Sequence, residues 1–331
     1  MNAKAVIFVQ PKQVQLGDIT LPASTERDIV VETEVSGISV GTERWAYLGL
    51  RPDVAFPSVP GYMAVGRITS AGAQAASKGW APGDRVYYFA SRLAGEVEGK
   101  SWMGSHVSHA VVDVCGARGN GDLEIHHCEK VPSDVPAEEA ALLGLCAVAM
   151  RGIEMAVVPV GAKVLVCGLG VIGQYALQVC QLKGASVTVT DIVEDRLKIA
   201  ESLGATVAKS IGDLAPGSFD IIIDTSSSSQ VVNSLFPLLK LRGKFVFQGW
   251  YPPPAQLDLN ALHQRLPSAY FPCAHSAEAV GAALEWAAKG WLKSAPLITH
   301  TFSPEDAAQA YEMIGAGSSD FLGVIFDWRK K

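Results

Sequence analysis

The sequence lacks an apolar run long enough to cross a bilayer, which takes about 20 consecutive apolar residues. Its longest apolar stretches, such as residues 137–150, are too short or too interrupted. The first ten residues read as a strand, without the basic start and cleavage site of a secretory leader. Neither a membrane-spanning nor a secreted protein is therefore expected.

The chain also lacks paired cysteines and a strong excess of charge. None of its six cysteines forms a Cys-x-x-Cys pair, and Cys146, Cys167 and Cys180 fall within apolar runs, where a free cysteine acts as a small hydrophobic residue. This usage is typical of reduced thiols in a cytoplasmic protein. The 33 acidic residues exceed the 27 basic ones only modestly, for a formal net charge of −6. That balance argues against nucleic acid or an anionic membrane as the main partner.

With 331 residues, of which 49% are hydrophobic, the chain is long enough for two globular domains. Short β-branched runs separated by Gly, Pro and Ser dominate its first half, which is typical of an antiparallel, barrel-like domain. The expected strands there are residues 5–9, 28–34, 65–70, 85–89 and 108–114.

The pattern changes near Pro136, where proline and two acidic residues begin a helix. Strands are then expected at 164–167, 186–190, 220–224 and 244–248, alternating with helices at 174–183, 194–203 and 230–239. This alternation predicts a parallel, doubly wound sheet with right-handed crossovers. The tail, with helices at 277–289 and 304–314 and a strand at 322–327, is expected to return to the first domain. We therefore predict an α/β protein with domains 1–149 plus 276–331 and 150–275.

A dinucleotide-binding motif, Gly168-Leu169-Gly170-Val171-Ile172-Gly173, follows an apolar strand and begins a helix. In that context its three glycines allow the tight turn, the approach of a pyrophosphate and close helix–strand packing. The pyrophosphate would bind backbone N–H groups at the helix start. The motif therefore predicts a nicotinamide dinucleotide site, which is also expected to include Ile192, Thr225 and Gly249.

Asp191 ends the second strand about 20 residues after the motif, where a carboxylate accepts hydrogen bonds from the adenosine ribose hydroxyls and repels a 2′-phosphate. NAD is therefore favoured over NADP. Arg196 is a candidate clamp for the ribose, and it is equally compatible with a solvated helix arginine paired with an acid such as Glu194.

Four motifs occur in the order usual for the medium-chain alcohol dehydrogenase and reductase superfamily, which the chain resembles over nearly its whole length: Gly61-Tyr-Met-Ala-Val-Gly66-Arg-Ile, Gly83-Asp84-Arg85-Val86, Ala140-Ala-Leu-Leu and the dinucleotide motif. The resemblance implies a GroES-like β-barrel-type catalytic domain and a Rossmann domain. It also implies a homodimer, because the strand at 268–274 is similar to the edge that pairs across the superfamily's dimer axis.

Shorter segments resemble a narrower group, the bacteriochlorophyll-pathway dehydrogenases that oxidise a hydroxyethyl side chain to acetyl. These segments are Ser36-Gly-Ile-Ser39-Val-Gly41-Thr42-Glu43-Arg44, Val59-Pro-Gly-Tyr62, Gly249-Trp-Tyr251 and Asp327-Trp328-Arg329.

The resemblance also implies that zinc is missing. The positions of the superfamily's three zinc ligands hold Val40, Tyr62 and Gly144, none of which is an ordinary zinc ligand. The cysteine-rich loop of the structural zinc is absent, since residues 93–109 contain no cysteine. His126-His127-Cys128 is a poor alternative site, because neighbouring residues on a strand point to opposite faces. We predict an enzyme without zinc.

Hydrogen-bond donors would then have to replace the metal, which otherwise polarises the carbonyl. Tyr62 occupies a vacated ligand position and can donate to a developing alkoxide. Thr42 matches the hydroxyl that relays protons in the family, and Ser39 and Glu43 are expected on the same loop. Our hypothesis is that Tyr62 and Thr42 bind the reacting oxygen while Glu43 orients the loop through Arg44. Structural alternatives stay open: Tyr62 fills the vacated volume, Thr42 is a turn hydroxyl, and Glu43 and Arg44 form an ion pair.

Aromatic residues are expected on loops or strand ends near the cleft, where they suit a flat or bulky apolar small-molecule substrate or else pack between domains. They are Trp45, Tyr47, Trp250, Tyr251 and Tyr270. The leading interpretation is an NAD-dependent, zinc-free oxidoreductase acting on a secondary alcohol or ketone. The alternatives are a zinc-free quinone or enoyl reductase acting on an activated C=C bond, and a nucleotide-binding module that has lost catalysis.

Overall fold

A computed structural model of the chain describes residues 1–93, 104–116, 119–120, 123–124, 128–251, 254–275, 277–317 and 319–330. The chain forms two units. Unit 1 comprises Met1–Gly144, Ser276–Lys289 and Ile298–Lys331, and unit 2 comprises Leu145–His275 and Gly290–Leu297. No helix of the described part of the chain is long and apolar enough to span a membrane.

The units differ from the domains predicted from the sequence at residues 145–149 and 290–297, which belong to unit 2. The first difference arises because helix α4 (Leu143–Ala156) continues through residue 149 without a break. The second arises because residues 293 and 294 bind helix α5 (Val171–Leu182): the Lys293 N–H donates to Gln178 Oε1 at 2.8 Å, and the Tyr175 hydroxyl donates to Ser294 Oγ at 2.7 Å.

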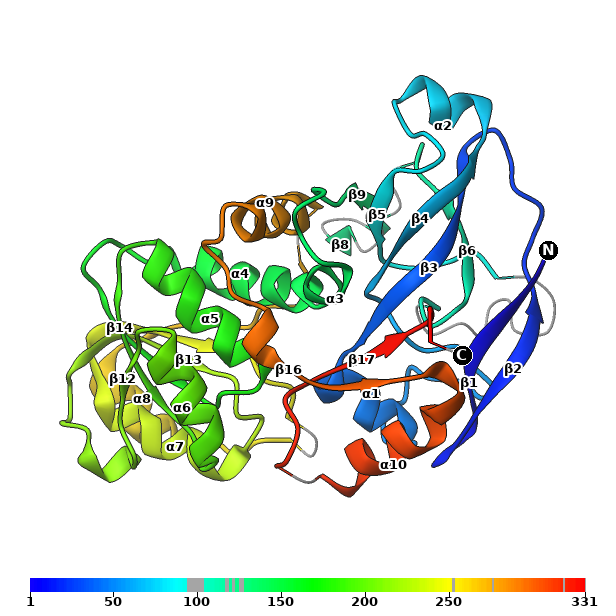
Figure 1. Cartoon of the computed structure of the whole chain (residues 1–331). Coiled ribbons are helices and arrows are strands. Elements are labelled where there is room, and N and C mark those ends of the chain that lie inside the picture. Colours follow the sequence, from blue (N-terminus) through cyan, green and yellow to red (C-terminus); the bar gives the residue numbers. More distant parts are fainter. Residues whose placement is uncertain are drawn as a thin grey trace. The chain divides into compact units, whose positions relative to one another are not determined.

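Unit 1 is built on a seven-stranded, mostly antiparallel sheet with the order β16-β17-β3-β4-β5-β9, in which β6 pairs with β3 (Figure 1). Its strands are β3 (Asp28–Ile38), β4 (Ala64–Ala71), β5 (Arg85–Tyr88), β6 (His109–Asp113), β9 (Cys128–Lys130), β16 (Ile298–Phe302) and β17 (Gly323–Asp327). Strands β1 (Asn2–Gln10) and β2 (Gln13–Thr20) form a hairpin, in which β1 makes single bridges to residues 58 and 107. A second, short hairpin pairs β7 (Gly119–Asn120) with β8 (Leu123–Glu124). The expected strands of the first half are therefore present.

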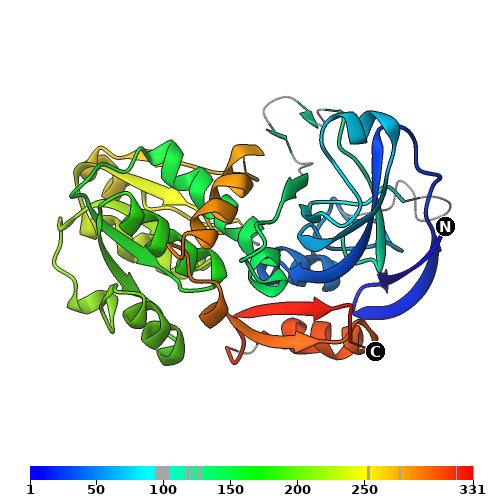
Figure 2. The ribbon, with the colours of Figure 1, turned by 45° about the horizontal axis from the view of Figure 1, so that its top comes forward.

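The helices of unit 1 are α1 (Val40–Tyr47), α2 (Ala73–Ser77), α3 (Ala137–Ala141), α9 (Ala277–Ala288) and α10 (Ala307–Ala316), with a 3₁₀ turn η5 (Pro304–Asp306). Figure 2 shows β16 and β17, orange and red, side by side along α10. Helices α1 and α10 share one buried core with β1, β17 and the end of β3, including Phe8, Ile38, Tyr47, Tyr311 and Phe326. This core fixes the start of α1, on which the candidate catalytic residues Thr42 and Glu43 lie.

Unit 2 is a six-stranded parallel sheet with the order β12-β11-β10-β13-β14-β15. Its strands are β10 (Lys163–Cys167), β11 (Ser186–Thr190), β12 (Thr206–Val207), β13 (Phe219–Asp224), β14 (Leu239–Phe247) and β15 (Ser268–Tyr270). Its other helices are α6 (Glu194–Ser202), α7 (Ser229–Leu235) and α8 (Leu259–Arg265), with 3₁₀ turns η2 (Ile211–Asp213), η3 (Phe236–Leu238) and η4 (Ala295–Leu297). The predicted doubly wound parallel sheet is confirmed.

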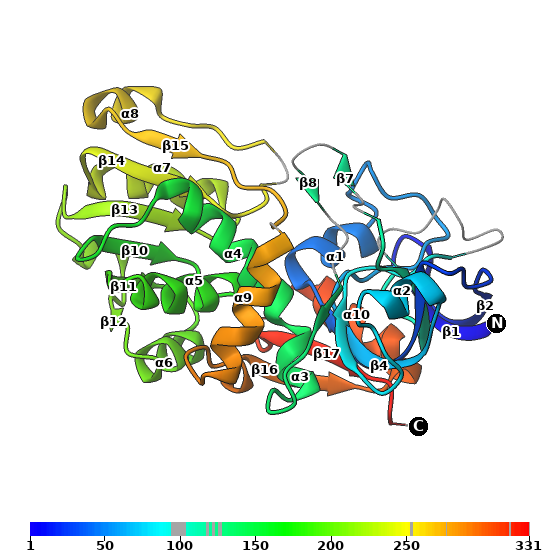
Figure 3. The same ribbon diagram turned by 90° about the horizontal axis from the view of Figure 1, so that it is seen from above.

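Helices cover both faces of this sheet. Helices α5 and α6 contact β11, and α8 contacts β14; Figure 3 shows α8 beside the β14–β15 end of the sheet. Leu165, Ile222 and Phe245 from three neighbouring strands form one buried core with residues of α7 and α8. Apolar side chains on both faces explain why the strand segments read as continuous hydrophobic runs.

Two elements are shorter than predicted. The helix expected at 230–239 ends at Leu235 and passes into η3, because Pro237 has no N–H to continue the helical hydrogen bonds. The strand expected at 268–274 covers only Ser268–Tyr270, since Pro272 cannot donate to a strand ladder.

Candidate functional site

The glycine motif of unit 2 lies in the turn between β10 and α5. Gly168 has a positive φ of +88°, which favours glycine. A Cβ on Gly173 would lie 2.0 Å from the Gly168 carbonyl oxygen, so only glycine allows α5 to approach the turn this closely. A Cβ on Gly170, in contrast, would meet nothing within 4 Å. The motif thus leaves open space at its middle glycine, as the binding of a pyrophosphate requires.

The other motif residues lie at the start of α5. Val171 begins the helix and is buried, whereas Ile172 is partly exposed. The Leu169 backbone N–H donates to Asp191 Oδ2 at 2.5 Å. Thr225, which follows β13, donates from its hydroxyl to the Gly168 carbonyl oxygen at 2.6 Å. Residues from three strand ends are therefore brought together at the carboxyl edge of the sheet, where ligands of such sheets bind.

Asp191 directly follows β11. Its second oxygen, Oδ1, accepts a hydrogen bond from the Val193 N–H at 2.8 Å, so the carboxylate is held by the glycine turn on one oxygen and by its own turn on the other. Ile192, between these residues, is 100% exposed, an unusual position for a large apolar side chain. The exposed side chain offers apolar surface beside the carboxylate, as an adenine ring would require.

Arg196 lies on α6 and is partly buried, and its carbonyl oxygen accepts a hydrogen bond from Gln174 Nε2 at 2.9 Å. Glu194, the partner suggested for Arg196, lies 3.8 Å from Lys198 Nζ.

The loop after β14 contributes Gly249, Trp250 and Tyr251. The Gly249 N–H donates to the Asp224 carbonyl oxygen at 3.0 Å, and the Tyr251 hydroxyl donates to the Asp224 carboxylate. Burial raises the pKa of Asp224, while hydrogen bonds from Tyr251 and Ser226 act in the opposite direction. Trp250 is 54% exposed. Asp224 was not predicted as a site residue; the only sequence signal for it is an acid at the end of an apolar strand.

Thr42 and Glu43 lie on a helix and not on the loop that was predicted. Ser39 is the residue before α1, and the Thr42 and Glu43 N–H groups both donate to the Ser39 carbonyl oxygen, at 3.0 and 2.7 Å. The Glu43 carboxylate in turn accepts from the Ser39 N–H at 2.8 Å, which stabilises this helix start. A segment with a glycine at 41 and few apolar residues gave no helical periodicity to read.

Tyr62 and Ser39 form the centre of this group. The Tyr62 hydroxyl donates to Ser39 Oγ at 2.6 Å, and the Tyr62 ring stacks on Phe89 with 5.4 Å between centroids. Burial raises the pKa of Tyr62 to about 12, against the lowering effect of hydrogen bonds with Ser39 and Thr42. The phenol is therefore a neutral hydrogen-bond donor at physiological pH.

Glu43 was predicted to orient the loop through Arg44, but its partners are other residues. The buried Glu43 carboxylate lies 3.0 Å from His106 Nε2 and accepts from the Tyr311 hydroxyl at 2.5 Å. Arg44 instead donates to the Ile314 carbonyl oxygen at 3.0 Å and lies over the Trp45 ring, 4.9 Å from its centroid. The reason is the helix itself, because consecutive residues of a helix point in different directions.

The residues at the superfamily's zinc positions do not fit a zinc ion. Val40 carries no donor atom, and a Cβ on Gly144 would lie 2.3 Å from the Tyr87 hydroxyl oxygen and 2.8 Å from Met63 Cγ, so neighbouring side chains fill the space a ligand there would need. Within the described ranges, no three His, Cys, Asp or Glu side chains come together as a metal site. His126 and His127 lie outside the described residues.

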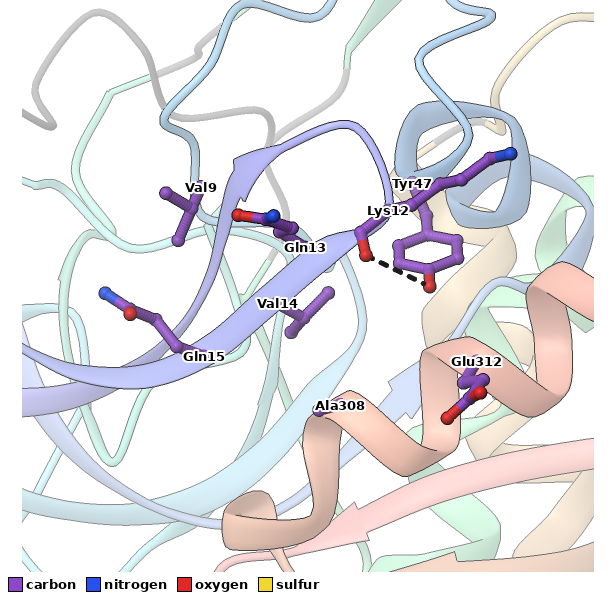
Figure 4. A pocket seen from close by; sticks show the side chains of 8 residues that line it. All are labelled: Val9, Lys12, Gln13, Val14, Gln15, Tyr47, Ala308 and Glu312. Carbon is purple, nitrogen blue, oxygen red and sulfur yellow. Dashed lines mark hydrogen bonds between the residues drawn. The ribbon is translucent and has the colours of Figure 1, made fainter.

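Of the aromatic residues predicted on loops or strand ends, Trp45 and Tyr47 lie instead on helix α1. Tyr47 is a core residue of α1, with its ring 5.8 Å from that of Tyr311. It also forms part of the wall of a surface pocket of about 470 Å³, shown in Figure 4, between β2 and α10. No other predicted site residue lines that pocket. Tyr270 lies at the end of the edge strand β15.

Comparisons with known proteins agree with this fold. A family model described as zinc-binding dehydrogenase matches residues 171–289. The 2-desacetyl-2-hydroxyethyl bacteriochlorophyllide A dehydrogenase of Cereibacter sphaeroides is 29% identical over 340 residues, which cover 99% of both chains. The family model and this full-length relative support the superfamily predicted from the sequence, that of the medium-chain dehydrogenases and reductases.

Solved structures show the same fold. The L-idonate 5-dehydrogenase of Escherichia coli matches with a TM-score of 0.85 at 18% identity, over 99% of each chain. The acetophenone reductase of Geotrichum candidum, solved in complex with NAD, matches with a TM-score of 0.84 at 19% identity, over 98% of this chain and 97% of that one. The predicted fold, a GroES-like domain with a Rossmann domain, and the predicted superfamily are confirmed.

Proposed function

We propose that this member of the superfamily is an NAD-dependent oxidoreductase that interconverts a secondary alcohol and a ketone, with the Tyr62 hydroxyl in place of zinc. The observation that carries the proposal is a buried phenol, hydrogen-bonded at 2.6 Å to Ser39, at a position where zinc members have a metal ligand. A nicotinamide dinucleotide, when bound, supplies or accepts the hydride. Gly168, Gly170 and Gly173 would hold its pyrophosphate, and Asp191 would bind its adenosine ribose.

In this proposal, Tyr62 donates a hydrogen bond to the carbonyl oxygen and gives up its proton as that oxygen becomes an alkoxide. Ser39 and Thr42, both hydrogen-bonded to Tyr62, then relay a proton from solvent water to the phenolate. The positive charge of Arg51 lowers the pKa of Tyr62 and so favours the phenolate formed meanwhile, whereas the charge of Glu43 opposes it.

The proposed substrate is a secondary alcohol on a bulky, flat ring system, such as a hydroxyethyl group that is oxidised to acetyl on a tetrapyrrole-like molecule. The name and full-length similarity of the C. sphaeroides relative support this class, as does the exposed ring of Trp250, with Trp45 and Tyr251 as further candidate contacts. NAD⁺ reduction with a hydroxyethyl bacteriochlorophyllide tests it. Binding of the dinucleotide without turnover of any secondary alcohol, or faster reduction of a C=C bond than of a ketone, would contradict it.

We further propose that unit 2 pairs with a second copy through β15. This strand is the edge of the parallel sheet, and the neighbouring Leu266 and Phe271 are 58% and 65% exposed. An apolar strand edge of this kind favours association with another chain.

Replacement of Asp191 by serine is expected to reduce the preference for NADH over NADPH about tenfold or more, because the carboxylate that repels a 2′-phosphate is lost. The ratio of the two dissociation constants, measured by fluorescence titration, is the quantity to compare, since Leu169 and Val193 also lose their acceptor. Asp195→Ser removes the same charge from an exposed site on α6 and should leave the ratio unchanged. A wild-type chain that binds NADPH more tightly than NADH would contradict the prediction.

Removal of metal is expected to leave turnover unchanged. The three vacated positions hold no zinc-ligand set, so prolonged dialysis against a chelator should not alter kcat. Elemental analysis of the dialysed and undialysed protein checks that no stoichiometric zinc was present at the start. One zinc ion per chain whose loss abolishes turnover would refute the proposed role of Tyr62.

A further inference from the structure

His106 is a completely buried histidine that the proposed reaction does not use. Its Nδ1 lies 2.7 Å from Ser36 Oγ, on β3, and its Nε2 lies 3.0 Å from Glu43 Oε2, on α1. The ring also meets Phe326 of β17 edge-on, with 5.2 Å between centroids. One side chain thus connects three elements of unit 1, two of them through hydrogen bonds.

Its neighbours indicate the hydrogen-bond role of each ring nitrogen. Trp328 Nε1, which can only donate, donates to Ser36 Oγ at 2.9 Å, so the Ser36 hydroxyl is available to donate to His106 Nδ1. Since a carboxylate oxygen accepts, Nε2 is the nitrogen that donates to Glu43. Tyr311 and the Ser39 N–H donate to the same carboxylate, so all its partners are donors. His106 therefore holds the Glu43 carboxylate, and this carboxylate holds the backbone N–H of Ser39.

The His106 segment also binds the segment that carries Tyr62. The His106 N–H donates to the Pro60 carbonyl oxygen at 3.1 Å, and the Ser105 N–H donates to that of Gly61 at 2.8 Å. Ser105 Oγ accepts from the Met63 N–H at 3.0 Å. A Cβ on Gly61 would lie 2.7 Å from two ring carbons of His106, so the imidazole packs directly against the backbone next to Tyr62.

We propose that His106 is the positioning residue of the Tyr62–Ser39 pair. It fixes Ser39 through Glu43, and it fixes Tyr62 through direct packing on Gly61, so it determines whether the two hydroxyl oxygens lie at the 2.6 Å that a strong hydrogen bond requires. The inference rests on the function proposed above, because only that function gives the Tyr62 hydroxyl its catalytic role. His106 itself touches neither substrate nor cofactor in this scheme.

Three substitutions separate its contacts. His106→Phe keeps a ring against Gly61 but loses both nitrogen atoms. His106→Gln places an amide nitrogen near the position of Nε2 and keeps a donor for Glu43, whereas His106→Asn reaches only toward Ser36. We expect His106→Phe and His106→Asn to lower kcat for NADH-dependent ketone reduction about tenfold or more, with little change in KM, and His106→Gln to recover most of the loss. The dissociation constant of NADH, bound by unit 2, should not change.

A spectroscopic readout on the full chain decides the inference without any substrate. The ultraviolet resonance Raman spectrum of each protein minus that of its Tyr62→Phe counterpart isolates the Tyr62 phenol and reports whether its hydroxyl donates a strong hydrogen bond. Wild type and His106→Gln should show a donating phenol, and His106→Phe should not. If His106→Phe fails to fold, His106→Asn provides the same comparison. An unchanged phenol signal in these variants would overturn the inference.

A double-mutant cycle then separates the inference from the proposed function. If His106 acts through Tyr62, adding His106→Phe to Tyr62→Phe should cost no further kcat. Fully additive losses would overturn the positioning role. A Tyr62→Phe enzyme with full activity would refute the proposed function alone, because the Raman comparison still tests whether His106 sets the Tyr62–Ser39 hydrogen bond.

Discussion

Tyr62→Phe is expected to lower kcat for ketone reduction by about 10²–10³-fold, the usual cost of removing a donor to a developing oxyanion. The substitution deletes one oxygen atom from a buried ring that stacks on Phe89, so the packing of the ring is kept. The dissociation constant of NADH should stay the same, because the dinucleotide is bound by residues of unit 2. Steady-state kinetics with a secondary ketone, combined with NADH titration, measures both quantities.

Tyr88→Phe is the matched control. Tyr88 is also a buried tyrosine of unit 1; its hydroxyl is bonded to that of Thr33 at 2.7 Å and lies 3.4 Å from the Ser105 carbonyl oxygen, so it contacts none of the proposed reacting groups. Loss of this hydrogen bond should reduce stability by about 1 kcal/mol and leave kcat within a small factor of wild type. Equal rates for Tyr62→Phe and Tyr88→Phe would show that Tyr62 only fills volume, the structural alternative left open by the sequence.

Tyr62 should also give ketone reduction and alcohol oxidation different pH dependences. Since burial raises the pKa of Tyr62 to about 12, its hydroxyl is protonated at neutral pH and ready to donate in ketone reduction. Alcohol oxidation needs the phenolate as base, so its rate should rise about tenfold per pH unit below that pKa. Tyr62→Phe should abolish this rise.

The parts of the site that were predicted from the sequence are those whose chemistry is local. The turn at Gly168–Gly173 needs glycine for reasons that act within a few residues, and Asp191 follows its strand directly. The parallel sheet was predicted for a similar reason, because strands buried on both faces are continuously apolar.

The rest of the site depends on contacts between distant segments. Glu43 is bonded to His106 and Tyr311, which lie 63 and 268 positions away along the chain, and no spacing rule relates them. The pairing of Asp224 with Tyr251 likewise follows from the order of strands β13 and β14 in the sheet. A single histidine between Ser105 and Val107 gives no sequence signal of its partners, so the positioning role of His106 emerges only from the fold.

Gly170→Ala should weaken binding of NADH about 100-fold or more without destabilising the chain. A methyl group at this position meets no protein atom within 4 Å, so the melting temperature should not fall. The same methyl group occupies the open space beside the helix start where the pyrophosphate must approach the backbone. Gly173→Ala should behave differently, because its Cβ would lie 2.0 Å from the Gly168 carbonyl oxygen and would force α5 away from the turn, lowering both stability and affinity.

Gly212→Ala serves as control for Gly170→Ala. It adds the same methyl group in unit 2, where the nearest atom is Ser210 Oγ at 3.5 Å, far enough for ordinary contact. Isothermal titration of NADH and thermal melts of the three variants distinguish the outcomes. Affinity lost in Gly170→Ala with an unchanged melting temperature places the phosphates on this turn. Unchanged affinity in that variant would mean that the glycine turn serves only the packing of α5, and the proposed hydride transfer would lose its cofactor site.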